Sequence, residues 1–305
     1  MAQVEAPLPE PAGGEVRVRV VASALNPADY KVILGTMKFL HGRRRPLVVG
    51  YDFSGTVDAI GPAVTGVAPG DDVFGFLPYG PFNQQGAFAE ALIAKCDAIA
   101  KKPASVPHER AAAAVTTGLT ALQAIRDVGQ LPATGRPQVL VTGVSGGVGS
   151  MAIAVAQRLG ATVTAVGSGR GLEIARRLGA AAVIDRTKQS VPGHLSAQFD
   201  VVFDAAAAYR WREWRGALKP NGTYVTTLPS LAFVVDKFRS LLAGSRVGFV
   251  NVKSRATDLR LLASWLEDGL DVSVLSTIPV REVPAGLRRL KEGGGRIAVR
   301  VADGF

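Results

Sequence analysis

A strand-like apolar segment at residues 138–142 runs directly into a glycine-rich turn, and a helix-like segment follows the turn. Three glycines recur there at three-residue spacing, and a second strand-like segment follows at 162–166. Glycine permits a tight turn and lets backbone N–H groups approach a pyrophosphate, while the helix N-terminus adds its positive dipole end. This order predicts a dinucleotide-binding β-α-β unit. The residues expected to contact the cofactor in this turn are Gly143, Ser145, Gly146, Gly147, Val148 and Gly149.

The end of the second strand bears on which dinucleotide binds. NAD-specific sites place a carboxylate there to bind the ribose hydroxyls. Here the strand is followed by Ser168 and Arg170, and the first carboxylate is Glu173. A carboxylate would repel the 2′-phosphate of NADP, whereas a hydroxyl and a guanidinium would bind it. We therefore predict NADPH as the cofactor, with Arg186 as a second candidate cation; the alternative is that both arginines are ordinary solvated surface residues.

Composition excludes several classes of protein. The chain has 305 residues and one cysteine, Cys96, so an intramolecular disulfide, a four-cysteine zinc site and a cysteine-ligated iron–sulfur cluster are excluded. No apolar run reaches the about 18 residues that span a bilayer, and the first residues lack the features of a secretory signal. We therefore expect a cytoplasmic protein with no membrane partner.

The formal charge of the chain is +10, but its basic residues are dispersed, and the densest cluster lies at residues 43–45. No nucleic-acid partner is therefore expected.

The pattern of the chain changes near residue 107. Before it, short strand-like segments are separated by Gly and Pro, which predicts a small β-barrel or sandwich. After it, helix-like segments alternate with apolar strands, which predicts a parallel sheet covered by helices. Strand patterns return near the end of the chain. The elements expected include strands at 16–21, 72–76, 87–94, 272–280 and 296–301 and helices at 108–114, 117–128, 150–159 and 283–292.

Several motifs, in the correct order, resemble the medium-chain dehydrogenase/reductase superfamily. The resemblance runs from about residue 14 to residue 301 and is strongest to the zinc-independent quinone oxidoreductase or alkenal reductase-like branch. Among the motifs are the segments ALNPADYK, VGYDFSGTV, GDDV and FDVVFD. They occupy residues 24–31, 49–57, 70–73 and 199–204, and further matches lie at 86–90, 113–121, 143–149 and 178–185.

The resemblance implies an α/β protein with a GroES-like β-barrel catalytic domain and a doubly wound parallel-sheet Rossmann domain that binds NADP. The catalytic, or substrate, domain is expected over residues 1–115 and 260–305 and the Rossmann domain over 116–259, with the active site in the cleft between them. Relatives usually have another strand before residue 14. Either the start codon was assigned late or that strand is missing, which would leave a sheet edge uncovered. Relatives are often dimers joined through Rossmann-domain strands, so a homodimer is one expectation.

The identities of the residues at the zinc positions predict that this chain binds no metal. Zinc-dependent members carry a Cys near the position of Asn26 and a His–Glu pair where this chain has Tyr51 and Asp52. Asn and Tyr are poor zinc ligands. The chain's histidines lie in unrelated segments without ligand spacing, and they are His41, His108 and His194. Without a metal, the favoured reaction is hydride delivery to an acceptor that is already electrophilic. We therefore predict an NADPH-dependent reductase of a small quinone or α,β-unsaturated carbonyl compound.

The matching segments supply the catalytic candidates. Asn26 could donate its amide to the substrate carbonyl, or form only an Asx turn before a proline. Lys31 could stabilise a developing enolate, with Asp29 either orienting it or capping a helix. Tyr51 could close the pocket, or simply pack as an aromatic residue on a strand. The resemblance adds further candidate contacts to the cofactor, which are Thr117, Thr120, Thr227, Leu228 and Arg296.

Two alternative functions remain open at this point. An enoyl-thioester reductase would need a larger pocket and a basic path for a phosphopantetheine, which residues 43–45 could form. A non-catalytic NADPH-binding sensor or nucleic-acid-binding protein is the other alternative. Nucleic-acid binding would show clustered basic residues interleaved with aromatics for stacking, and the sequence has no such cluster.

Overall fold

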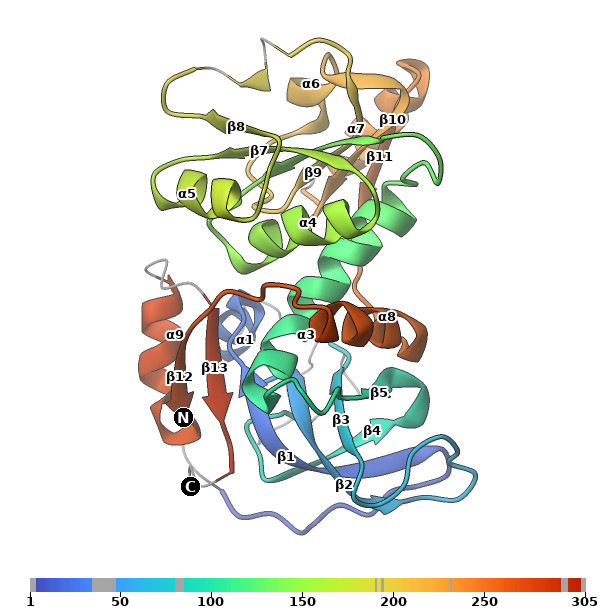
Figure 1. The fold of residues 1–305 in the computed structure, drawn as a ribbon, viewed down its shortest axis with the longest axis vertical. Helices are drawn as coiled ribbons and strands as arrows, with labels where there is room; N and C mark the ends of the chain where they lie inside the picture. Colours follow the sequence, from blue (N-terminus) through green and yellow to red (C-terminus); the bar gives the residue numbers. More distant parts are fainter. Residues whose placement is uncertain are drawn as a thin grey trace. The chain divides into compact units, whose positions relative to one another are not determined.

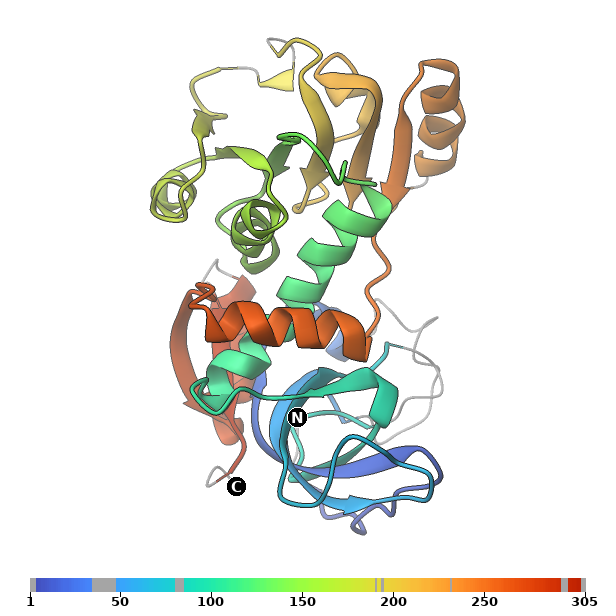
Figure 2. The same cartoon turned by 45° about the vertical axis from the view of Figure 1, so that its right-hand side comes forward.

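The computed structural model describes residues 4–34, 48–79, 85–189, 191–192, 195–230, 232–291 and 296–302 (Figures 1 and 2). The chain divides into two compact units. The first unit comprises Met1–Thr116 and Lys253–Phe305, and the second comprises Thr117–Val252. The sequence pattern placed the second boundary at 259/260, whereas the contacts place it at 252/253, so that helix α8 (Ala256–Glu267) belongs to the first unit.

In the part of the first unit that the structure describes, the strands form a seven-stranded sheet with the order β12-β13-β1-β2-β3-β5, in which β4 also pairs with β1. β12 and β13 run parallel, and the other pairs are antiparallel. The strands are β1 (Glu15–Ala24), β2 (Asp52–Ile60), β3 (Asp72–Phe76), β4 (Ala91–Lys95), β5 (Ile99–Lys101), β12 (Val274–Pro279) and β13 (Arg296–Arg300). The helices are α1 (Pro27–Ile33), α8, α9 (Val283–Lys291) and the first half of α3 (His108–Leu122).

Alternation along β1 shows why this segment is a strand. Val16, Val18 and Val20 are buried, and the residues between them are half-buried or exposed, as expected for a sheet with one face in the core. This confirms the strand predicted at 16–21 and extends it at both ends.

Two predicted elements differ from the structure. Strand 87–94 is shortened to β4, because the N–H groups of Ala87 and Phe88 donate to the carbonyls of Gly50 and Val49 rather than to a continuous strand partner. The helices predicted at 108–114 and 117–128 form one continuous helix, α3, which ends in a wider helical turn at Gln123–Val128. No proline interrupts this segment, and its residues from 111 to 125 are buried, so packing favours continuation.

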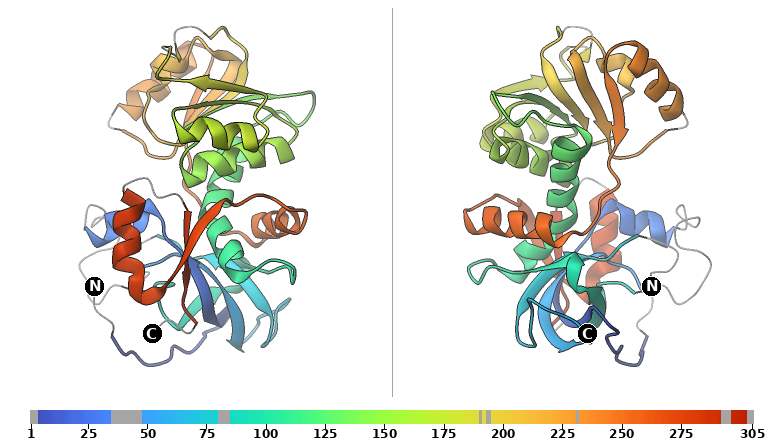
Figure 3. Two further views of the ribbon diagram at one scale, coloured as in Figure 1. Left: turned by 60° about the vertical axis from the view of Figure 1, so that its left-hand side comes forward. Right: turned by 90° about the vertical axis from the view of Figure 1, so that its right-hand side faces the viewer.

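The described residues of the second unit form a six-stranded parallel sheet with the order β11-β10-β9-β6-β7-β8 (Figure 3). The chain order reverses between β6 and β9, and ligands of doubly wound sheets bind at such a switch point. The strands are β6 (Gln138–Thr142), β7 (Thr162–Gly167), β8 (Ala182–Asp185), β9 (Phe199–Asp204), β10 (Leu218–Thr226) and β11 (Arg246–Phe249). The helices are α4 (Gly147–Arg158), α5 (Arg170–Arg177), α6 (Trp211–Trp214) and α7 (Phe233–Leu242), together with the second half of α3.

A cluster of aromatic and aliphatic side chains fills one side of this sheet. Trp211 and Trp214 pack with Phe199 and Tyr224 among the buried aliphatic residues. The parallel strands are apolar along most of their length because helices cover both faces. Among the residues that the structure describes, no helix is long and apolar enough to cross a membrane.

Candidate functional site

The glycine turn lies where β6 meets α4. Gly143 has a φ of +70°, and its carbonyl accepts a hydrogen bond of 3.0 Å from the N–H of Gly146. A Cβ at Gly149 would lie 2.3 Å from the Gly143 carbonyl oxygen, so only glycine allows the helix to pack this closely on the turn. At Gly146 the nearest atom to an added Cβ would be 3.4 Å away, and Ser145 and Gly146 are exposed. The turn is therefore open on its outer side, above the N-terminus of α4.

The start of α5, which follows the short loop after β7, packs directly on this turn. A Cβ at Gly171 would lie 3.2 Å from both the backbone nitrogen and the Cβ of Ser145. Arg170 is the first residue of α5 and is exposed, and Ser168 is half-buried. The N–H of Arg186, which follows β8, donates to the carbonyl of Gly167 at 3.0 Å. The structure thus brings the glycine turn, Ser168, Arg170 and Arg186 together at the carboxyl ends of β6, β7 and β8.

The neighbouring strand ends are tied together by Asp204, a fully buried residue that the sequence did not single out. Its Oδ1 accepts from the Thr142 hydroxyl at 2.6 Å, and its Oδ2 accepts from the Tyr209 N–H at 2.8 Å and lies 3.0 Å from the Tyr224 hydroxyl. The sequence feature that could have pointed to Asp204 is its position at the end of β9, in the FDVVFD segment. Asp204 therefore fixes the carboxyl edge of the sheet at the switch point.

Thr227 and Leu228 follow β10 at the same edge. The Thr227 hydroxyl donates to the carbonyl of Ala205 at 3.3 Å, and Leu228 is exposed. The other two candidates, Thr117 and Thr120, are buried on α3.

The residues of this edge fit a nicotinamide dinucleotide. The turn needs glycine at Gly143 and Gly149 yet is open at Gly146, and the first N–H groups of a 12-residue helix lie beside it. The exposed guanidinium groups of Arg170 and Arg186 can bind phosphate, and no carboxylate occupies residues 168–170.

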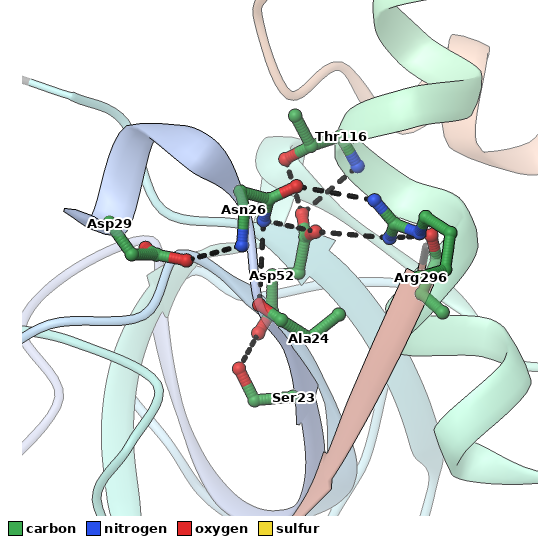
Figure 4. A network of polar contacts seen from close by, with 8 residues as sticks. Ser23, Ala24, Asn26, Asp29, Asp52, Thr116 and Arg296 are labelled. Atoms are coloured by element: carbon green, nitrogen blue, oxygen red, sulfur yellow. Dashed lines mark hydrogen bonds and ion pairs between the residues drawn. The ribbon is translucent and has the colours of Figure 1, made fainter. Parts of the chain in front are cut away.

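A second group of candidates forms a buried polar network in the first unit (Figure 4). At its centre is Asp52, which is fully buried at the start of β2. Its Oδ1 accepts from the Thr116 N–H at 2.9 Å and from the Thr116 hydroxyl in a very short contact, and its Oδ2 accepts from the Asn26 amide at 2.9 Å. Arg296 Nη2 lies 3.7 Å from that same Oδ2. One carboxylate therefore joins four segments that are distant in the sequence.

Arg296 supplies the positive charge of this network. Its Nη1 donates to the side-chain amide oxygen Oδ1 of Asn26 at 3.2 Å, and its Nη2 donates to the backbone carbonyl of Ala113. Burial lowers the pKa of Arg296, and the facing carboxyls of Asp52 and Asp29 oppose that shift. Burial raises the pKa of Asp52, and Arg296 and the hydrogen bonds from Thr116 and Asn26 oppose it. Among the described residues, Nε of Arg296 has no hydrogen-bond partner.

The Asn26 side chain is occupied within this network. Its nitrogen bonds Asp52 and the Ala24 carbonyl, and its oxygen accepts from Arg296. Arg296, which the sequence placed near the cofactor, is 6% exposed and directs both Nη atoms at protein groups. The sequence analysis missed Thr116. It also missed the role of Asp52, whose carboxylate holds Asn26, Thr116 and Arg296 together. The signal was an acidic residue between two aromatic residues, Tyr51 and Phe53, because a carboxylate that is buried among such side chains requires a cation or several donors.

The remaining candidates are Asp29 and Lys31, which lie on α1, and Tyr51, which directly precedes β2. The Asp29 carboxyl group accepts from the Asn26 N–H at 2.6 Å and so caps the helix, and burial raises the pKa of Asp29 to about 8. Tyr51 is buried, its ring centroid lies 4.2 Å from that of Tyr79, and burial raises its pKa. Lys31, on the same helix, is exposed.

Within the described ranges, no group of three or more His, Cys, Asp or Glu side chains is placed to hold a metal ion. His108 lies between Ser54, whose hydroxyl is 2.9 Å from Nδ1, and Asp72, whose Oδ2 is 3.3 Å from Nε2. His41, His194 and the basic residues 43–45 lie outside the described residues.

Comparison with known proteins places this architecture in a family. Residues 12–104 match the family model of the alcohol dehydrogenase GroES-like domain, and residues 147–228 match that of the zinc-binding dehydrogenases. The mitochondrial NAD(P)H oxidoreductase RTN4IP1 of Bos taurus is 35% identical over 325 residues, which cover 92% of this chain and 80% of the relative. The chain belongs to the medium-chain dehydrogenase/reductase superfamily. It is therefore an oxidoreductase, and the predicted fold and family are confirmed.

Other members of the superfamily are similar over most of the chain. The chloroplast envelope quinone oxidoreductase homolog of Arabidopsis thaliana is 31% identical over 74% of this chain and 70% of the relative. The solved structure of the quinone oxidoreductase from Coxiella burnetii has a TM-score of 0.83 and 27% identity, and covers 98% of this chain and 94% of that chain. The chain spans 60% of the length of the Mus musculus and Homo sapiens proteins named RTN4IP1.

Proposed function

We propose that this protein is an NADPH-dependent, zinc-independent reductase of quinones or α,β-unsaturated carbonyl compounds. The observation that carries the proposal is the edge at the ends of β6, β7 and β8, where Ser168, Arg170 and Arg186 adjoin the glycine turn without a carboxylate at residues 168–170. Relatives named as quinone oxidoreductases support the acceptor class. The 2-methylene-furan-3-one reductase of Solanum lycopersicum, 36% identical over 75% of this chain and 60% of the relative, supports it as well.

Each part of the edge has a role in holding the cofactor. The N–H groups around Gly146 and Gly147 would bind the pyrophosphate, and Ser168 and Arg170 the 2′-phosphate, with Arg186 as a further cation. The second half of the cofactor would contact residues from α3 and from the end of β10, which are Thr117, Thr120, Thr227 and Leu228. When bound, the nicotinamide supplies a hydride.

The network around Asp52 supports chemistry without zinc. The family resemblance places Asn26 and Tyr51 where zinc-dependent members carry ligands. The Asp52 carboxylate is engaged by Arg296, Thr116 and Asn26. Without a Lewis acid, the acceptor must be electrophilic by itself, which favours quinones and enones over simple alcohols or ketones. Asn26 then has a positioning role at the start of α1, and Lys31 on that helix is the charged group that would stabilise the anionic oxygen of the product.

The test is a panel of NADPH and NADH oxidation assays with quinones, enals, enones and crotonyl thioesters. We expect turnover with quinones or enones and a preference for NADPH. Turnover with crotonyl thioesters alone would favour an enoyl-thioester reductase. NADPH binding without turnover of any substrate would favour a non-catalytic sensor.

Arg170 provides a test of cofactor choice. We expect Arg170→Ala to weaken NADPH binding about tenfold to a hundredfold, because loss of one charge-assisted phosphate contact costs about 1.5–3 kcal/mol. NADH binding should be nearly unchanged. The measurement is the Kd of each cofactor by nicotinamide fluorescence, with Arg176→Ala on the same exposed helix as the control. Equal losses for both cofactors would refute the assignment.

Metal removal provides a second test. Dialysis against a strong chelator should leave the turnover rate equal to that of the untreated protein within experimental error. The reason is that the chain offers no zinc ligand set among the described residues. Metal content is measured on the same samples. Stoichiometric zinc that leaves together with activity would contradict a zinc-independent reaction.

Lys31 provides a test of the reaction itself. We expect Lys31→Ala to slow single-turnover NADPH oxidation roughly three- to tenfold with an enone, because water screens an exposed ammonium and limits its contribution. The effect with a quinone should be smaller, since a quinone gains aromatic stabilisation on reduction. Lys95→Ala, another exposed lysine of the first unit, is the control. Wild-type rates with both substrates would show that Lys31 has no part in the reaction.

A further inference from the structure

Strand β10 contains a bulge near its amino end, and an asparagine in the left-handed conformation lies in it. Among the described residues of the sheet, Leu218 and Thr223 have partners on neighbouring strands, whereas residues 219–222 have none. Within this bulge Asn221 has a φ of +63° and is exposed. Asparagine is one of the few residues other than glycine that adopt this conformation readily. The bulge therefore places an asparagine at the surface, directly before Gly222.

The position after Asn221 requires glycine for reasons of space. A Cβ at Gly222 would lie 2.9 Å from the backbone oxygens of both Lys219 and Phe199, so any larger residue would displace the bulge or the start of β9. The packing of the bulge and the positive φ of Asn221 thus combine to produce an Asn–Gly step. Among the four asparagines of the chain, only Asn221 precedes glycine. The others precede proline, glutamine and valine, and they are Asn26, Asn83 and Asn251.

An Asn–Gly step can lose ammonia without an enzyme. The backbone nitrogen of the glycine attacks the side-chain amide carbon of the asparagine, a new C–N bond closes a cyclic imide, and the side-chain nitrogen leaves as ammonia with the proton of the attacking N–H. Water then opens either carbonyl of the imide, which gives an aspartyl or an isoaspartyl residue. A glycine favours the attack because it has no Cβ to crowd its nitrogen. Within the part of the chain that the structure describes, no hydrogen bond holds the Asn221 side-chain amide away from Gly222.

The backbone of Asn221 attaches the last strand of the sheet to its neighbour. Its N–H donates to the carbonyl of Gly244 at 2.7 Å, and its carbonyl accepts from Nη2 of Arg246 at 2.6 Å. Nη1 of Arg246 donates to the side chain of Gln130. Gly244 lies between α7 and β11, and Arg246 begins β11, which pairs with β10 (Figure 1). An isoaspartyl residue adds a methylene group to the backbone between this N–H and the next peptide carbonyl. The two hydrogen bonds therefore cannot both keep their geometry.

We propose that Asn221 is a site of spontaneous deamidation, and that its isoaspartyl product loosens the attachment of β11 to β10. The reaction takes up water, releases ammonia and needs no partner or cofactor. The hydrogen bonds of Asn221 make it slower in the folded chain than in the unfolded chain, because the Gly222 nitrogen must move toward the side chain. The change lies at the amino end of β10, whereas Thr227 and Leu228 follow its opposite end. The proposal is therefore independent of the proposed NADPH site.

The test incubates the protein in warm, mildly alkaline buffer made with heavy-oxygen water and maps its peptides by mass spectrometry. The peptide that contains Asn221 should take up heavy oxygen and appear in aspartyl and isoaspartyl forms. It should react at least roughly tenfold faster than the peptide with Asn251, which is also exposed but precedes a β-branched valine that crowds the attacking nitrogen. Asn221→Gly keeps the positive φ and both backbone hydrogen bonds, and it should take up no label at this position.

The reacted protein tests the effect on the sheet. Ion-exchange chromatography separates the deamidated chains, and an isoaspartyl methyltransferase measures their isoaspartyl content. We expect the isoaspartyl form to have an equilibrium constant of unfolding in urea roughly three- to tenfold larger than wild type, as for the loss of about one hydrogen bond. Asn221→Asp carries the same charge on a normal backbone, so it is the matched control and should unfold like wild type. The NADPH affinity of the isoaspartyl form should equal that of wild type.

Each outcome bears on a separate part of the proposal. An Asn221 peptide that stays unlabelled in the folded protein, or that reacts no faster than the Asn251 peptide, would overturn the modification site. Isoaspartyl chains that unfold like Asn221→Asp would overturn the loosening of β11. A loss of NADPH affinity in the isoaspartyl chains alone would overturn the confinement of the change to the amino end of β10. Failure of wild type itself to bind NADPH would contradict the proposed function and leave the labelling and unfolding measurements valid.

Discussion

Arg296→Met is expected to lower the free energy of unfolding by about 3–5 kcal/mol, the cost of breaking a buried ion pair by removing one partner. Methionine keeps much of the volume but removes the donors that reach Asn26 Oδ1 and the Ala113 carbonyl, and the cation beside Asp52. The Asp52 carboxylate would then remain in a fully buried site with only its hydrogen bonds to oppose desolvation. Urea denaturation followed by circular dichroism measures the effect.

Arg300→Met is the matched control, since Arg300 lies on the same strand as Arg296. Its guanidinium pairs with Glu109 at 2.9 Å, but its side chain is 57% exposed, so we expect a loss of about 1 kcal/mol or less. Asp52→Asn combined with Arg296→Met should cost less than the sum of the single changes, because the double variant leaves no unpaired charge. Equal losses for Arg296→Met and Arg300→Met would mean that the buried network does not stabilise the fold.

The parallel-sheet unit was predictable because its signals are local in sequence. The turn between β6 and α4 needs glycines at Gly143 and Gly149 for reasons of space alone, and the apolar strands have the length that a buried sheet requires. Helix α7 was not predicted, although its residues have helical spacing. The sequence cannot show which side of an amphipathic helix faces the protein, and here the polar side does. The apolar positions of α7 therefore do not mark the side on which this helix packs against the protein.

The buried network could not be predicted because its members meet only in the folded chain. Asn26, Asp52, Thr116 and Arg296 come from four segments, and each has an ordinary local interpretation: a turn residue, a strand residue, a helical residue and a surface cation. Residue identity alone predicts that Asn26 and Tyr51 are poor zinc ligands, and zinc independence stays a prediction. The assignments of individual residues to cofactor and substrate stay predictions, and the substitutions above address them.

Asp29 is expected to make the stability of the protein depend on pH over an unusual range. Burial raises the pKa of its carboxyl from 3.8 to about 8. Between these two pH values the folded chain keeps a proton on Asp29 that the unfolded chain releases. The contribution of protonated Asp29 to the free energy of unfolding is therefore complete below about pH 4 and is lost as the pH rises toward 8. The corresponding slope is ~1 kcal/mol for each pH unit in the middle of this range.

Asp29→Asn should remove this slope, because an amide does not titrate and its oxygen can still accept the hydrogen bond from the Asn26 N–H. We expect the variant to gain stability relative to wild type as the pH rises from 5 to 8, by a few kcal/mol in total. The measurement is the free energy of unfolding in urea at each pH. Asp58→Asn, a carboxylate on β2 that pairs with Arg17 at 2.8 Å, is the control and should not show this rise. Parallel pH profiles for wild type and Asp29→Asn would show that Asp29 is already charged at neutral pH.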